Sequence, residues 1–229
     1  MRVAVLRCRN LPSFVTWEVP DAEALFTDDR MLIDAFARQG IAAESVVWTD
    51  PVDWDTFDVA LIRSTWDYID EREQFLQVLG AIERSSCLLF NTLDTVRWNS
   101  DKSYLLELAE RGVSTIPTVR ASHPDIGGWL EQFGAVGAVI KRPAAGDFRI
   151  QSIYGGTVEP VTPSAADLEQ AVAIARTLPG DPLYARLDLV RFGGELAVME
   201  FELIEPFLFF DHAPAAADRL ASATAARAR

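Results

Sequence analysis

The chain has 229 residues, of which 49% are hydrophobic and 24% are charged, so it is long enough for one large globular domain or two small lobes. Its 21 lysines and arginines against 34 aspartates and glutamates give a net charge of −13, which argues against a general nucleic-acid surface or an anionic-membrane surface. An anionic ligand must therefore be met by local cations or by a metal ion.

The ends and the cysteines of the chain favour a cytoplasmic protein. The N-terminus has one cation and too short an apolar stretch for a signal peptide, and no stretch approaches the roughly 20 apolar residues of a membrane helix. Cys8 and Cys87 lie in apolar runs, which favours buried thiols over catalytic ones. The cysteines and histidines do not have the spacing of a zinc site. We expect no membrane and no nucleic-acid partner.

The first half of the chain alternates strand-like and helix-like segments. Amphipathic helices are predicted at 27–40 and 71–85, between short apolar runs at 3–8, 42–48, 57–64 and 87–91. This alternation is typical of an α/β fold with a parallel, doubly wound sheet. Ligands of such sheets gather at the carboxyl ends of the strands.

Polar and aromatic side chains follow the strand that ends near residue 64. The segment reads RSTWDY, and Arg63, Trp66 and Tyr68 stand where a substrate would be held. The alternative is an ordinary loop in which Thr65 or Asp67 caps the next helix. The sequence leaves both interpretations open.

A charged helix at 100–112 ends at Gly112, and a short strand is predicted at 114–121. We place a domain boundary here, with an N-terminal α/β domain at 1–116 and a second domain at 117–229. Further segments of the second domain are expected to be a helix at 126–134, a strand at 137–143, a glycine-bearing segment at 144–156 and a helix at 164–180. The second domain is therefore expected to be α+β with antiparallel strands.

Three carboxylates stand on the last two predicted strands. Glu200 and Glu202 are two positions apart in an extended run, so they share a face, and a Gly-Gly turn at 193–194 would bring the strand of Asp188 alongside. The alternative is an exposed acidic edge that discourages aggregation. The apolar surroundings make three charges expensive without compensation, and three hard oxygen ligands suit Mg²⁺.

Several cations and glycines could meet a phosphate group. Lys141 closes an apolar strand before a glycine-bearing turn, and Arg149 follows in the segment GDFR. Gly155 and Gly156 form a second turn, whose ordinary role would be a hairpin. No P-loop and no dinucleotide fingerprint occurs, so neither of those nucleotide sites is supported.

Taken in order, these segments resemble a known family. The ordered set is RSTWDY, NTLDTVRWNSDKSYLLELAERGVSTIPT, KRPAAGDFRIQSIYGG and YARLDLVRFGGELAVMEFELIEP. It resembles the ATP-grasp carboxylate–amine ligases, in the branch of glutathione synthetase, the RimK-like ligases and D-cycloserine synthetase. The resemblance implies that ATP phosphorylates a small amino-acid-like carboxylate and that an amine-type nucleophile then displaces the acyl phosphate. The implied cofactors are ATP and Mg²⁺.

The resemblance also implies roles for individual residues. The Mg²⁺ ligands would be Asp188, Glu200 and Glu202. The groups around the nucleotide would be Lys102, Lys141, Gly155 and Gly156, with Arg149 and Lys141 as catalytic cations. The carboxylate substrate would be bound by Arg63, Trp66, Tyr68 and Arg149.

One departure from the family defines a second hypothesis. Only 47 positions separate Lys141 from Asp188, too few for a full nucleotide lid together with the helix at 164–180. The alternative to a ligase is therefore a lid-deleted relative that does not bind nucleotide and acts as a binding or scaffold protein. A lost segment would expose apolar surface near Phe207, Phe209 and Phe210, a patch suited to a homo-oligomer.

Overall fold

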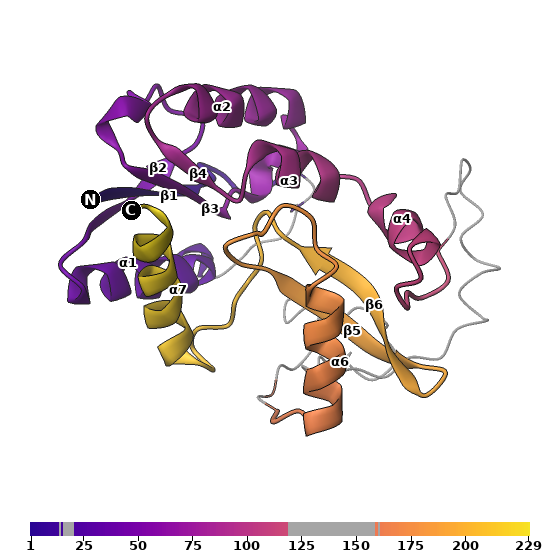
Figure 1. Ribbon diagram of the computed structural model, residues 1–229. Coiled ribbons are helices and arrows are strands. Elements are labelled where there is room, and N and C mark those ends of the chain that lie inside the picture. Colours follow the sequence, from indigo (N-terminus) through magenta and orange to yellow (C-terminus); the bar gives the residue numbers. More distant parts are fainter. Residues whose placement is uncertain (14, 16–20, 119–158, 160) are drawn as a thin grey trace. The chain divides into compact units, whose positions relative to one another are not determined.

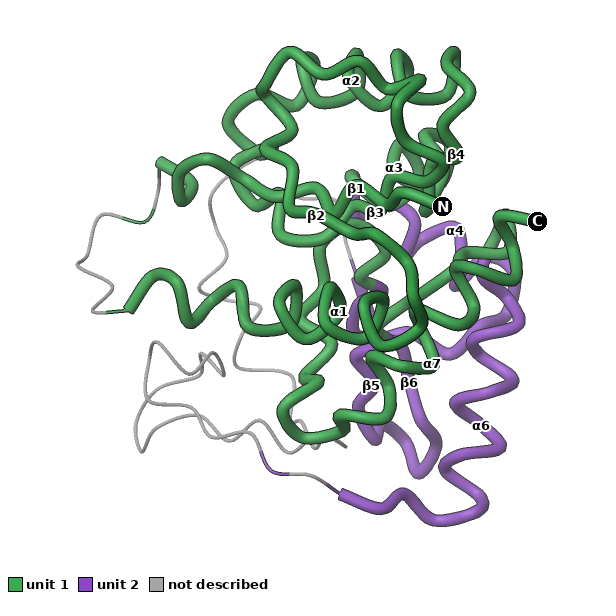
Figure 2. Tube along the Cα trace, turned by 90° about the vertical axis from the view of Figure 1, so that its left-hand side faces the viewer, with its two compact units in different colours: residues 1–100, 179–186, 202–229 green, residues 101–178, 187–201 purple. Residues whose placement is uncertain are grey.

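The computed structural model describes residues 1–13, 15, 21–118, 159 and 161–229. The chain divides into two compact units, which Figure 2 colours separately. The first unit contains residues 1–100, 179–186 and 202–229, and the second contains 101–178 and 187–201. The sequence-based boundary between residues 116 and 117 stays a prediction.

The first unit is built on a parallel sheet of four strands in the order β2-β1-β3-β4. The strands are β1 (Arg2–Arg7), β2 (Ala42–Val47), β3 (Val59–Ser64) and β4 (Leu88–Phe90). Every residue of β3 is buried, as expected for a strand with both faces covered. The parallel sheet predicted from the alternating segments is confirmed.

Helices cover both faces of this sheet (Figure 1). One face carries α2 (Arg72–Arg84) and α3 (Leu93–Asn99), with Phe75 and Leu79 buried against it. The other carries α1 (Thr27–Arg38) and α7 (Pro214–Arg227). Helix α7 contains the alanine-rich tail, and it packs on α1 through small buried residues such as Ala217 and Ala221.

Short helices complete the first unit. They are the 3-10 helices η1 (Ala22–Phe26), η2 (Trp54–Thr56) and η3 (Trp66–Ile69). Cys8 and Cys87 are buried, and burial raises the pKa of each thiol to about 11. This agrees with the expectation of inert thiols.

The second unit contains α4 (Tyr104–Glu110), α6 (Ala165–Ala175), β5 (Arg186–Phe192) and β6 (Glu195–Glu202). Strands β5 and β6 form a two-stranded antiparallel ribbon whose first and last residues belong to the first unit. The turn between them is Gly193-Gly194, with φ of 61° and 95°, values that favour glycine. The predicted strand at 114–121 is reduced to a bridge between Thr115 and Val198, and its residues beyond 118 lie outside the described part.

The chain after β6 is attached to the first turn of α1 by one side chain. The buried carboxylate of Asp28 accepts hydrogen bonds from the backbone N–H groups of Leu208, Phe209 and Phe210, at 2.6, 3.0 and 3.0 Å. Phe210 is only 1% exposed, which corrects its expected place in an exposed apolar patch. Phe207 is 36% exposed, and the prediction of a homo-oligomer stays untested.

None of the helices in the described residues is both long enough and apolar enough to cross a membrane.

Replacing Asp28 by alanine should lower the free energy of unfolding by about 2–4 kcal/mol, because one buried and two partly buried N–H groups lose a charged acceptor. Urea unfolding followed by circular dichroism measures this change. Asp34→Ala removes an exposed carboxylate from the same helix and should have little effect. Equal stability of the two variants would contradict the role given to Asp28.

Candidate metal centre

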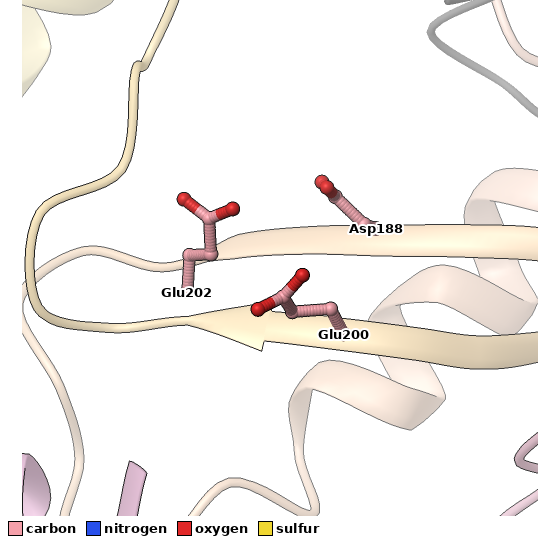
Figure 3. A group of neighbouring side chains, drawn as sticks. All are labelled: Asp188, Glu200 and Glu202. Carbon is pink, nitrogen blue, oxygen red and sulfur yellow. The ribbon is translucent and has the colours of Figure 1, made fainter. Parts of the chain in front are cut away.

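Three carboxylates meet on one face of the β5–β6 ribbon. Asp188 lies on β5, and Glu200 and Glu202 lie on β6. One carboxylate oxygen from each residue lies within 4.8 Å of the others, and all three side chains project to the same side of the ribbon (Figure 3). All three are half-buried. Because one ribbon carries all three, the hairpin brings them to the same face.

The strand period of two explains this arrangement. Glu200 and Glu202 point to the carboxylate face, while Phe201 and Leu203 are 1% and 0% exposed. The apolar positions therefore anchor the ribbon and leave the acidic positions on the opposite side. The proximity predicted from the i, i+2 spacing and the Gly-Gly turn is present in the structure.

Among the described residues, Lys102 and Arg186 compensate part of the negative charge of the trio. The ammonium group of Lys102 pairs with Glu200, and the guanidinium group of Arg186 pairs with Glu202. Arg186 also donates to the carbonyl of Phe207 at 3.3 Å, and its guanidinium lies 5.8 Å from the centre of the Phe209 ring. Without such partners, like charges at this separation would repel one another.

The donor set fits a hard divalent cation. Mg²⁺ prefers oxygen ligands and is commonly held by one or two carboxylates together with phosphate oxygens and water. Lys102 and Arg186 pair with two of the three carboxylates. Asp188, Glu200 and Glu202 together supply the kind of oxygen ligands that could hold Mg²⁺.

Side chains also hold the backbone of β6. The hydroxyl group of Tyr104 accepts a hydrogen bond from the N–H of Phe201 at 2.8 Å and donates to its carbonyl at 3.2 Å. The Tyr104 and Phe201 rings stack with centroids 6.1 Å apart. Nearer the start of the strand, Val198 exchanges backbone hydrogen bonds with Ser114 and Ile116. Phe201, which lies between Glu200 and Glu202, is thus held through both its N–H and its carbonyl group.

Arg63, at the end of β3, is a buried residue of the first unit. Its Nη2 donates to the carbonyl of Pro206 at 2.9 Å, and its Nε lies 3.8 Å from the carboxylate of Asp29. Its Nε and Nη1 have no hydrogen-bond partner among the described residues. Burial raises the pKa of Asp29, although the charge of Arg63 and a hydrogen bond from Ser64 act in the opposite direction. These contacts give Arg63 a structural role that the sequence interpretation did not include.

Trp66 and Tyr68 also make contacts within the first unit. The Trp66 indole N–H lies 3.4 Å from the carbonyl of Glu205, and its ring stacks on Phe207 with centroids 5.1 Å apart. The Tyr68 ring packs against the Phe75 ring, with the two ring centroids 5.0 Å apart. Burial, followed by the negative charge of Glu205, raises the pKa of the Tyr68 phenol. Binding of substrate by Arg63, Trp66 and Tyr68 stays a prediction.

The remaining predicted site residues are not described. Lys141, Arg149, Gly155 and Gly156 all lie outside the described residues.

Sequence reasoning missed Arg186 as a member of the site. Arg186 is two positions before Asp188 on a strand, so the same alternation that groups the carboxylates puts it on their face. The i, i+2 spacing is thus sufficient to predict that Arg186 lies beside the carboxylates. The contribution of Tyr104 was not recognisable, because it depends on a hydrogen bond to a backbone 97 positions away.

Comparison with known proteins confirms the resemblance to ATP-grasp ligases. Residues 3–91 match the family model described as the N-terminal domain of D-cycloserine synthetase DcsG. The chain is 37% identical over 103 residues to the cycloserine biosynthesis protein DcsG of Streptomyces lavendulae. That match covers 44% of this chain and 34% of the relative, so the chain matches about a third of the relative's length.

Solved structures share the fold. The crystal structure of D-cycloserine synthetase DcsG matches with a TM-score of 0.69 and 24% identity, covering 100% of both chains. A RimK domain ATP-grasp protein from Sphaerobacter thermophilus matches with a TM-score of 0.54 and 16% identity, covering 99% of this chain and 98% of the other. The ATP-grasp ligase PsnB, complexed with precursor peptide PsnA2 and AMPPNP, matches with a TM-score of 0.57 and 12% identity. This match covers 100% of this chain and 97% of the other. The fold is therefore that of ATP-grasp proteins.

Replacing Glu200 by glutamine should weaken Mn²⁺ binding by at least about tenfold, because the trio loses one anionic ligand. Electron paramagnetic resonance of free Mn²⁺ during a titration gives the dissociation constant. Glu195→Gln removes the same charge from an exposed position of the same strand and is the matched control. If both variants bind Mn²⁺ equally well, the cation does not bind at the trio.

Proposed function

We propose that this chain, which has the ATP-grasp fold, is an ATP- and Mg²⁺-dependent ligase that joins a small carboxylate to an amine-type nucleophile. The observation that carries the proposal is the carboxylate trio on the β5–β6 ribbon, with a lysine and an arginine beside it. A cluster of that composition suits a metal ion that meets nucleotide phosphates. The matches to ATP-grasp ligases support the same class of reaction.

The proposed reaction has two steps. An oxygen of the substrate carboxylate attacks the γ-phosphorus of ATP, and the bond to the β–γ bridging oxygen breaks to release ADP. The nitrogen of the nucleophile then attacks the carbonyl carbon of the acyl phosphate, inorganic phosphate leaves, and the nitrogen loses a proton. Mg²⁺, when bound, neutralises charge on the phosphates during the transfer.

The described residues would contribute positioning and charge. Asp188, Glu200 and Glu202 would hold the metal ion, and the ammonium group of Lys102 already lies at the edge of the trio, where a phosphate could reach it. Positioning and electrostatic stabilisation supply most of the catalysis of phosphoryl transfer. Arg186 would keep Glu202 oriented and would offset the negative charge of the metal ligands.

Other roles follow from the resemblance alone. Lys141, Gly155 and Gly156 would contact the nucleotide, and Arg149 and Lys141 would stabilise the transferred phosphoryl group. The substrate carboxylate would be recognised by Arg149 and by the loop of Arg63, Trp66 and Tyr68. We propose a small amino-acid-like substrate. The scaffold alternative is not favoured, because the matches include ATP-grasp ligases and the trio with its neighbouring cations suits a metal ion that meets nucleotide phosphates.

Incubation with ATP, Mg²⁺ and a panel of amino acids and amines should release ADP and phosphate, measured by a coupled assay. Glu200→Gln should lower the turnover by at least about a hundredfold, since the metal ion can no longer be held correctly. Glu195→Gln should retain the wild-type rate. Absence of ADP release, together with no shift of the melting temperature by Mg·ATP, would exclude the ligase and favour the scaffold alternative.

A further inference from the structure

One buried side chain, that of Asn91, binds the backbone just before β5 and just after β6, at the open end of the hairpin. Its Nδ2 donates to the carbonyl of Tyr184 at 3.0 Å and to the carbonyl of Leu203 at 2.7 Å. Its Oδ1 accepts a hydrogen bond from the N–H of Leu183 at 2.8 Å. Asn91 is 1% exposed, and both of its amide donors are in use. It therefore connects the chain entering β5 with the chain leaving β6.

These contacts lie next to the metal-binding end of the ribbon. Leu203 directly follows Glu202, and Tyr184 is four positions before Asp188. Asn99, at the end of α3, accepts the N–H of Leu203 at 2.9 Å. Both polar backbone atoms of Leu203 are thus bound by asparagine side chains. A shift of the peptide group that joins Glu202 to Leu203 would move the Cα atom of Glu202.

Asn91 itself is well fixed. It follows β4, which pairs in register with β3 in the centre of the sheet. It lies before the N-cap of α3, Thr92, whose hydroxyl accepts the N–H of Thr95. Tyr184 is anchored in addition by its hydroxyl group, which donates to the carbonyls of Ile62 and Ile204. The residues just before β5 and just after β6 are therefore held by hydrogen bonds to residues of the parallel sheet and the segment after it.

We propose that Asn91 is a positioning residue for the metal centre. Its amide fixes the separation of the two strand ends, and through it the distance between the carboxylates of Asp188 and Glu202. Groups that orient metal ligands from outside the coordination sphere commonly alter metal affinity by 10- to 100-fold. The inference rests on the proposed binding of Mg²⁺ by the trio.

Asn91→Asp tests this role with almost no change of shape. Aspartate keeps an acceptor for the N–H of Leu183 but cannot donate to the two carbonyls, which it repels when ionised. We expect the Mn²⁺ dissociation constant, measured by electron paramagnetic resonance below the melting transition, to rise about tenfold. Asn91→Ser, which keeps one donor and is milder, should give a smaller rise in the same direction.

Phe57→Leu separates positioning from loss of stability. Phe57 is buried just before the first residue of β3, whereas Asn91 follows the last residue of β4, so the two lie at opposite ends of these parallel strands. This variant should lower the melting temperature while its Mn²⁺ affinity stays within about twofold of wild type. An equal loss of affinity in Phe57→Leu and Asn91→Asp would overturn the inference, because it would show a general effect of stability.

A measurement on the wild-type protein needs no variant to fold. Mg²⁺ should slow amide hydrogen exchange in peptides containing Leu183 and Leu203 more than in peptides from α1, because metal binding and the asparagine contacts favour the same strand separation. Equal protection everywhere, or wild-type affinity in Asn91→Asp, would overturn the role of Asn91 alone. If the wild-type protein binds neither Mn²⁺ nor Mg²⁺, the proposed function fails and the inference fails with it.

Discussion

Mutual repulsion of three carboxylates within 4.8 Å of one another is the constraint on which the architecture around the ribbon depends. The repulsion is offset by two ion pairs, one with Lys102 and one with Arg186. The side chain of Lys102 is 64% exposed and that of Arg186 is 15% exposed, so solvent screens the first pair much more than the second. In the proposed ligase, such an arrangement would let the lysine exchange its partner for a phosphate while the arginine keeps Glu202 in place.

Neutral hydrogen bonds from side chains also hold the backbone of the ribbon. Tyr104 binds the peptide groups of Phe201, and Asn91 and Asn99 bind those of Leu203. Further along the chain, Asp28 binds three N–H groups of the segment 208–210. A two-stranded ribbon has little stability of its own in water. The side chains that meet its backbone therefore supply order that its own ladder cannot.

Much of this fold follows from local sequence patterns. The parallel sheet is predictable because buried strands read as short apolar runs between amphipathic helices. The trio is predictable because alternation on a strand and a Gly-Gly turn are both local rules. Arg186 obeys the same alternation, because it stands two positions before Asp188 on β5.

The residues that hold the site could not be found in this way. Asn91 and Asp28 contact backbone atoms about 90 and 180 positions away, and a backbone atom leaves no mark in the sequence of its partner. Arg63 looked like a residue facing substrate because it ends a parallel strand, yet it is 2% exposed and bound to the carbonyl of Pro206. The burial of Phe210 could not be predicted from local sequence either, since it depends on packing against a helix near the other end of the chain.

The central claim is that Asp188, Glu200 and Glu202 bind the metal ion that accompanies ATP. Crystals grown with Mn²⁺ and a nonhydrolysable ATP analogue test it most directly, through the anomalous scattering of manganese. We expect an anomalous peak bonded to carboxylate oxygens of the trio and to phosphate oxygens of the nucleotide. A nucleotide whose manganese lies away from all three carboxylates would contradict it.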